Sequence, residues 1–355
     1  MNKYMKKIKD GNKKYNKAQT NFLFKIFSLI FIILFGKLNL QIYSNNIKTL
    51  EFLINGQIND FQINKPINFD YNNYNFAVIR RSIRKTSGLF SIYNNFLGCI
   101  RDYMIKGFIP IIELQTYKNT INGFEVNLLK GNPWEYYFNQ PFDFKYNIVK
   151  KKAKNIKYFE CYSWVIPNSK IFLNKKIMNY WHNIAARFIP IKKELIKESN
   201  NIINRIFNKS RNILGVLLRG TDYIAGKPKG HPIPPKTEDV IKDIKILDNK
   251  YKYDWIFLAT EDNIIRQYFL RAIRTKVKCL LSKNNITYDY SKKKLLAFNI
   301  NFKKNIDYNK IYLLNIIILS KCLDFLGART NGAIGVYILT EGFRNSKVYN
   351  LGKYK

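Results

Sequence analysis

The sequence lacks three short motifs that often identify phosphate and nucleotide sites. It contains no G-x-G-x-x-G and no G-x-x-x-x-G-K-[ST], which argues against a dinucleotide-dependent dehydrogenase and against a P-loop kinase. It also contains no D-x-D, the acidic motif that commonly holds a divalent metal on a diphosphate. If the chain binds a diphosphate, arginine, lysine and backbone dipoles must stabilise it without a metal.

Cysteine is scarce, and its spacing excludes further classes. No two of the four cysteines form a C-x-x-C pair, which speaks against a zinc site and against a disulfide framework. Cys99, Cys279 and Cys322 lie in apolar surroundings, so we expect buried free thiols there. Cys161 is far from the other three in the sequence.

Acidic residues are few, and the chain is strongly basic. It has 24 Asp and Glu against 61 Lys and Arg, a formal net charge of +37. The lysines are spread along the whole chain, whereas a nucleic-acid-binding protein more often concentrates its charge on one face or arm. Such a field attracts anionic lipids and nucleotide-activated substrates alike. No nucleic-acid partner is expected, although a membrane-tethered basic nucleic-acid-binding protein remains an alternative.

Residues 1–45 predict a basic tail followed by a hydrophobic, membrane-associated segment. Residues 22–35 are apolar except for Lys25 and Ser28, a run shorter than the ~20 residues of a usual spanning helix. Residues 22–43 therefore indicate a single-pass signal anchor, a monotopic helix on a membrane surface, or an uncleaved signal-like segment. The catalytic part is then expected in the cytosol if the protein is bacterial and in a lumen if it is eukaryotic.

The rest of the chain alternates strand and helix patterns, which predicts parallel sheets covered on both faces. A βαβ unit is expected from a strand at 76–79, a helix reaching about Lys106 and a strand at 108–113. Residues 150–210 are expected to be mostly helical. A second unit has expected strands at 213–218, 254–259, 276–281, 323–327 and 347–351, with helices near 236–248, 262–273, 309–321 and 332–342. The predicted domains are 46–205, an amino-terminal α/β domain, and 206–355, a carboxyl-terminal Rossmann-like domain.

Three of the expected strands in the second unit end in polar loops, at residues 219–222, 260–262 and 328–333. Because the carboxyl ends of parallel strands meet at one edge of a sheet, we expect these loops to form one ligand crevice. It would hold two arginines, two carboxylates and the amino terminus of a helix, which suits a sugar nucleotide. The residues predicted to bind the donor are Arg219, Gly220, Thr260, Glu261, Asp262, Arg329, Thr330, Asn331 and Gly332.

Together the three loops resemble those of the fucosyltransferase superfamily, which includes the α1,2-, α1,6- and protein O-fucosyltransferases. Val216–Tyr223 is similar to the family's arginine-containing first motif, in which Arg219 matches the arginine that grips the donor diphosphate. Leu217 stands where that motif has a histidine, and one of its paired arginines is missing. Ile256–Asp262 and Asp324–Gly332 are similar to the second and third motifs. The Gly88–Ser91 turn and residues 132–141 look like those of a microbial subgroup.

The resemblance implies a GT-B-like fold, with two Rossmann-type domains whose parallel sheets face across a cleft. Residues 46–205 would then lie on the acceptor side, and residues 206–355 would bind the nucleotide sugar. It also implies an inverting, metal-independent transfer of fucose from GDP-fucose to a hydroxyl of a glycan or glycoconjugate, with no cofactor. Arg219 would neutralise the diphosphate, and Asp222 and His231 are the candidates for the base that such a transfer needs. Transfer from another nucleotide sugar, or a transferase-like fold that has lost activity, remains open. The acceptor cannot be read from the sequence.

Overall fold

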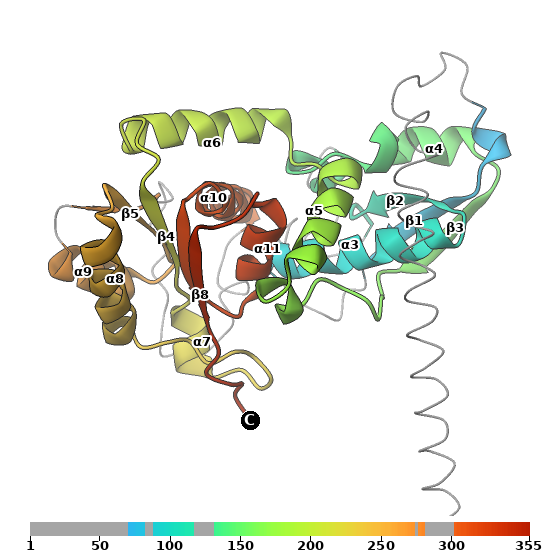
Figure 1. The fold of residues 1–355 in the computed structure, drawn as a ribbon. Coiled ribbons are helices and arrows are strands. Elements are labelled where there is room, and N and C mark those ends of the chain that lie inside the picture. The colour runs from blue at the N-terminus through green and yellow to red at the C-terminus, as the bar shows by residue number, and fades with distance from the viewer. Residues whose placement is uncertain (1–69, 82–87, 117–130, 274–275, 281–301) are drawn as a thin grey trace, which may run out of the picture. The chain divides into compact units, whose positions relative to one another are not determined.

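The computed structural model describes residues 70–81, 88–116, 131–273, 276–280 and 302–355, and only the backbone of residues 221, 222 and 302–307. All of them belong to one compact unit, Asp70–Lys355, which contains two parallel β-sheets (Figure 1). The expected membrane segment at 22–43 lies outside the described residues. Within the described part of the chain, no helix combines the length and the hydropathy that a membrane span requires.

The first sheet has three parallel strands in the order β2-β1-β3. Helix α3 follows the central strand and is buried along most of its length. Helix α4 and three short 3-10 turns lie in the same stretch of the chain as this sheet. The elements are β1 (Phe76–Arg80), α3 (Leu89–Ile105), β2 (Ile109–Glu113), α4 (Tyr146–Lys152) and β3 (Ile156–Glu160), with 3-10 turns η2 (Tyr71–Asn73), η3 (Pro133–Tyr136) and η4 (Pro141–Asp143).

Strand β3 corrects the expectation that residues 150–210 are mostly helical. It pairs with β1 over its whole length, from Phe76↔Ile156 to Arg80↔Glu160. As an edge strand with exposed Lys157 and Tyr158, it lacks the continuous apolar run that indicates a buried strand. The helices expected in that region follow it, after turn η5 (Ser169–Phe172), as α5 (Lys175–Phe188) and α6 (Lys193–Ile206).

The second sheet has five parallel strands in the order β6-β5-β4-β7-β8. The chain runs outward from β4 through β5 to β6, then returns to the other side of β4 for β7 and β8. This is the doubly wound order of a Rossmann-type sheet, whose strand order reverses at β4. Its elements are β4 (Ile213–Leu217), α7 (Thr221–Gly226), α8 (Thr237–Tyr251), β5 (Trp255–Ala259), α9 (Asn263–Ala272), β6 (Val277–Lys278), α10 (Phe302–Ser320), β7 (Asp324–Ala328), α11 (Asn331–Leu339) and β8 (Asn345–Tyr349).

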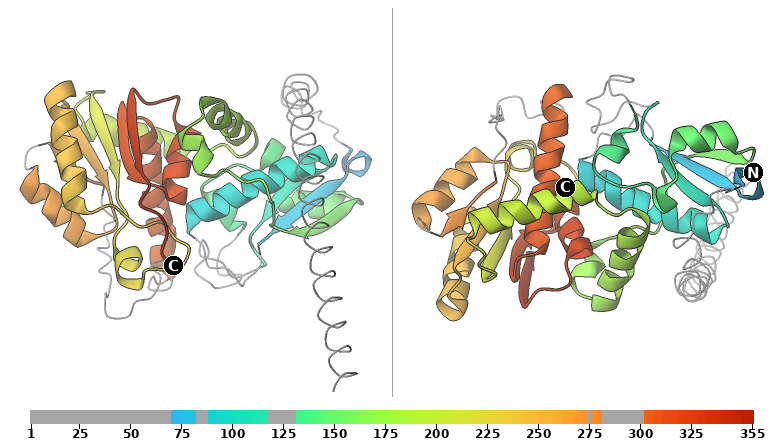
Figure 2. Two further views of the ribbon diagram at one scale, coloured as in Figure 1. Left: turned by 60° about the horizontal axis from the view of Figure 1, so that its bottom comes forward. Right: turned by 90° about the horizontal axis from the view of Figure 1, so that it is seen from above.

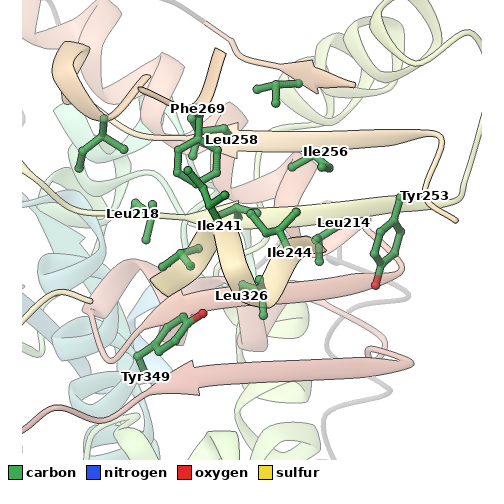
Figure 3. Close-up of a cluster of buried hydrophobic side chains, with 14 residues drawn as sticks. Leu214, Leu218, Ile241, Ile244, Tyr253, Ile256, Leu258, Phe269, Leu326 and Tyr349 are labelled. Atoms are coloured by element: carbon green, nitrogen blue, oxygen red, sulfur yellow. The ribbon is translucent and has the colours of Figure 1, made fainter. Parts of the chain in front are cut away.

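Helices cover both faces of the second sheet (Figure 2). On one face, alternate residues of β4 and β5 pack against Ile241 and Ile244 of α8 and Phe269 of α9 (Figure 3). On the other face, Gly215 lets α10 approach closely, because a Cβ there would lie 3.0 Å from Leu319. The alternating α/β pattern and the parallel sheets are therefore confirmed. The domain boundaries and the cleft between the domains stay predictions.

Candidate functional site

The three polar loops lie at one edge of the second sheet, as the sequence predicts. In the register of the strands, Leu217 of β4 is opposite Ala259 of β5 on one side and Gly327 of β7 on the other. The loops that begin with Arg219, Thr260 and Arg329 therefore leave the sheet side by side. Since the strand order reverses at β4, the carboxyl ends of β4 and β7 form the switch point at which such sheets bind ligands.

Arg219 is held by the loop that follows β5. Its Nε atom lies 3.4 Å from Oε1 of Glu261, and the same oxygen accepts a hydrogen bond of 3.0 Å from the amide of Gly220. The guanidinium also lies over the ring of Tyr223, 4.9 Å from its centroid. Both charged side chains are largely buried, so this ion pair is less screened by solvent than a surface pair. Glu261 thus orients Arg219 before any ligand arrives.

Asp262 is the N-cap of helix α9. Its Oδ1 accepts hydrogen bonds of 2.8 Å and 3.2 Å from the amides of Ile264 and Ile265, and the residue is 2% exposed. Thr260 supports the same turn, since its hydroxyl accepts a hydrogen bond of 3.1 Å from the amide of Asp262. These two residues shape the loop after β5, and a contact of either with a nucleotide stays a prediction.

The third loop leads from β7 into helix α11. The hydroxyl of Thr330 caps the helix by accepting a 3.2 Å hydrogen bond from the amide of Ala333. Asn331 accepts a 3.2 Å hydrogen bond from Nδ2 of Asn94 in α3, which links this helix start to the first sheet's main helix. Arg329 precedes the cap, and its buried Nε has no hydrogen-bond partner within the described part of the chain. An unsatisfied buried donor beside a helix amino terminus is suited to an anion.

Tyr312 is a residue of this site that sequence patterns did not indicate. It lies on α10, and a Cβ on Gly332 would collide with its hydroxyl oxygen. Burial raises the pKa of Tyr312, and the charges of Arg219 and Glu261 act on it in opposite directions. The phenol therefore stays protonated at neutral pH and can donate a hydrogen bond. Its position within an apolar helix gives no sequence signal for such a role.

His231 lies in a loop that the carboxyl-terminal segment holds in place. Its amide donates to the Pro228 carbonyl over 3.0 Å, and its own carbonyl accepts from the amide of Tyr354 over 3.0 Å. Its ring meets the ring of Tyr223 edge-on, with centroids 5.2 Å apart, and the same Tyr223 ring also contacts Arg219. The side chain of Asp222 lies outside what is described.

The second histidine, His182, makes a contact between two helices. It lies on α5, and its Nδ1 is 2.8 Å from the carbonyl oxygen of Ile338 in α11. This contact joins two helices, as expected of a structural histidine. In the described residues no group of three or more His, Cys, Asp or Glu side chains is placed to hold a metal ion.

No family model matches the sequence, and no curated protein matches it either. Several solved structures are similar to it. One is the NodZ alpha-1,6-fucosyltransferase soaked with GDP-fucose, with 12% sequence identity, a TM-score of 0.41 and coverage of 75% of this chain and 93% of that one. Another is fucosyltransferase NodZ from Bradyrhizobium, with 11% identity, a TM-score of 0.44 and coverage of 75% and 94%. A third is POFUT1 in complex with GDP, with 9% identity, a TM-score of 0.45 and coverage of 78% and 99%.

Proposed function

We propose that the chain is a glycosyltransferase that moves a fucosyl-type sugar from a nucleoside-diphosphate donor to an acceptor hydroxyl, without a metal. One observation carries the proposal. Arg219 and Arg329 leave the carboxyl ends of β4 and β7, where the strand order reverses, and helix α11 begins beside them. Two guanidinium groups and a helix amino terminus at a switch point favour a diphosphate ligand.

The same groups supply what the leaving diphosphate needs. As the bond between the sugar C1 and the phosphate oxygen breaks, negative charge grows on that oxygen. Arg219, Arg329 and the amides of Asn331 and Gly332 at the start of α11 would stabilise this charge, since the first amides of a helix have no partners within it. The protonated hydroxyl of Tyr312, which lies against Gly332, can donate a further hydrogen bond to it.

The acceptor oxygen would attack C1 from the side opposite the diphosphate, which inverts the anomeric configuration. Its proton must pass to a base as the new bond forms. Asp222 and His231 are the residues we propose for this step, because both lie in the segment that follows Arg219. The Tyr223 ring contacts both the His231 ring and the Arg219 guanidinium, so the loop that carries His231 lies beside the proposed donor site.

The choice of donor and acceptor rests on the sequence motifs. Their resemblance to the fucosyltransferase superfamily makes GDP-fucose the donor that we propose, with a glycan or glycoconjugate as acceptor. A different nucleotide sugar is the second candidate, because Leu217 replaces the histidine of the first motif. The proposal includes attachment to a membrane through residues 22–43, with the transferase on the side that holds the nucleotide sugar.

Thermal unfolding in the presence of nucleotides tests the donor site. We expect GDP to raise the Tm in the absence of metal, and UDP, ADP and CMP to raise it less. A ligand at 100 times its Kd stabilises the folded state by about 2.7 kcal/mol, which is readily measured. Arg219→Ala should abolish the shift. Arg211→Ala is the matched control, because Arg211 is an exposed arginine just before the amino end of the same strand. Absence of any nucleotide shift from folded protein would refute the proposed function.

A further inference from the structure

Two of the four cysteines, 62 residues apart in the sequence, meet in the structure. Cys99 lies in the middle of α3 and is 0% exposed, whereas Cys161 directly follows β3 and is half-buried. Their sulfur atoms are 3.1 Å apart. A disulfide bond needs about 2.05 Å, so the two sulfurs have to approach by only about 1 Å.

The backbone around both cysteines is fixed by other contacts, and these bring the sulfurs together. The amide of Cys161 donates to the carbonyl of Arg80, which prolongs the pairing of β3 with β1. Gly98, next to Cys99, lets the backbone of Val165 lie directly on α3, where a Cβ would collide with it. The hydroxyl of Ser163 donates a 2.7 Å hydrogen bond to Oδ2 of Asp102, one turn further along α3. The loop at 161–165 is therefore attached to α3 on both sides of the cysteine pair.

We propose that Cys99 and Cys161 are a site of oxidative cross-linking and form an intramolecular disulfide bond when the protein meets a small disulfide oxidant such as oxidised glutathione. This inference is independent of the proposed transferase activity. Cys161 is the more exposed partner and therefore meets the oxidant first. The buried guanidinium of Arg81 lies near both sulfurs. The contact with Cys161 and burial raise the pKa of the Cys99 thiol, which assigns the first attack to Cys161.

The reaction is two successive thiol–disulfide exchanges. The sulfur of Cys161, having lost its proton, attacks one sulfur of the oxidised glutathione and releases one glutathione, which takes up a proton. The sulfur of Cys99 then gives up its proton and attacks the Cys161 sulfur of the mixed disulfide, releasing the second glutathione. The protein loses two thiol hydrogens and two electrons, and one oxidised glutathione becomes two reduced molecules.

The cross-link would act on an aromatic loop. Tyr162 is 57% exposed and Trp164 is 87% exposed, and their rings meet edge-on with centroids 5.1 Å apart. Both follow Cys161 within three residues, so a bond to Cys99 would fix the base of the segment that carries these rings. We expect slower amide hydrogen exchange over residues 161–166 in the oxidised protein, and unchanged exchange in α8, which lies in the other sheet's layer.

Peptide mapping tests the cross-link. The full chain is reduced, freed of reductant, incubated with oxidised glutathione under native conditions, alkylated and digested for mass spectrometry. The expected product is a peptide pair joined through Cys99 and Cys161. Cys279 and Cys322 should remain free thiols during the incubation and then be alkylated. In Cys99→Ser, Cys161 should instead accumulate as a glutathione adduct, and Cys322→Ser should retain the cross-link.

Two results would overturn the proposal. One is a wild-type protein in which Cys161 carries glutathione while Cys99 remains open to alkylation after unfolding. The other is a cross-link that involves Cys279 or Cys322 in place of this pair. Both are read from the wild-type chain, so they hold even if a cysteine variant does not fold.

Discussion

Gly220 is the position at which the geometry of the candidate site can be tested most sharply. A Cβ on this residue would overlap the Asp262 carboxylate and lie 2.6 Å from its Cβ. Asp262 is almost wholly buried and caps α9, so it cannot move aside without losing the hydrogen bonds to the Ile264 and Ile265 amides. Gly220→Ala must therefore displace either the Arg219 loop or the cap.

The size of the effect follows from these two contacts. Loss of an N-cap costs about 1 kcal/mol, and overpacking of a filled site costs about 1–3 kcal/mol. Since either cost applies, we expect Gly220→Ala to lower the free energy of unfolding by about 1–3 kcal/mol, seen as a lower denaturant midpoint with an unchanged m-value. Gly88→Ala is the control, because among the described residues no atom lies within 4 Å of a Cβ at Gly88, and its φ of −64° suits any residue. That change should stay within about 1 kcal/mol of wild type.

A second substitution turns this into a double-mutant cycle. Asp262→Gly removes the Cβ and the carboxylate that obstruct residue 220, while glycine is itself a tolerated N-cap that costs only a few tenths of a kcal/mol more than a polar cap. The double variant Gly220→Ala with Asp262→Gly should be more stable than the sum of the single effects predicts, by at least about 1 kcal/mol. Strict additivity would refute the claim that the two loops touch at this point.

Two further predictions concern buried polar groups. Burial raises the pKa of the Asp324 carboxyl, but hydrogen bonds from Arg344 and Tyr253 outweigh burial and hold it below its usual value. Asp324 thus stabilises the fold above the unfolded pKa of about 3.9, and this stability is lost as the pH falls through the lower folded value. Asp324→Asn should lower the free energy of unfolding by about 2–4 kcal/mol at pH 7 in urea titrations. The variant should also lose less stability than wild type as the pH falls below about 4. The same loss at acid pH in both proteins would contradict this role of Asp324. Tyr312→Phe should weaken GDP binding by about 5–10-fold in calorimetry, the loss of one hydrogen bond, with a Tm of the free protein close to wild type; an equal affinity would remove Tyr312 from the site.

The sequence predicted the three central strands of the second sheet well because they are almost wholly buried. Strands such as Ile213–Leu217 and Asp324–Ala328 are short apolar runs that end in polar loops, and parallel pairing then fixes which loops are neighbours. Strand β3 was not predicted because its neighbouring residues Lys157 and Tyr158 are both exposed, so the strand has neither a continuous apolar run nor a strict alternation. Strand β2, the other edge of the same sheet, was predicted because four of its five residues are buried.

Sequence patterns did not predict the contacts between residues that are distant in the sequence. Tyr312 reaches the site only because α10 passes under the start of α11, and Asn94 reaches Asn331 from 237 residues away. The pairing of Cys99 with Cys161 likewise depends on how α3 lies on β1 and β3. The roles of the acidic pair at 261–262 also needed the structure, since sequence alone did not show that Glu261 binds Arg219 while Asp262 caps a helix.

A bound phosphate would affect Arg219 and Arg329 differently, and this difference suggests a separate role for each arginine in the proposed site. Arg219 is already engaged by Glu261 and Tyr223, so its direction is set, and a phosphate would add to an existing ion pair. The buried Nε of Arg329 has no acceptor in the described chain, a state that costs roughly 1–3 kcal/mol. A phosphate oxygen placed there would relieve that cost. In the proposed function, Arg329 therefore contributes mainly affinity for the diphosphate, whereas Arg219, fixed by Glu261, contributes mainly the orientation from which the sugar is transferred.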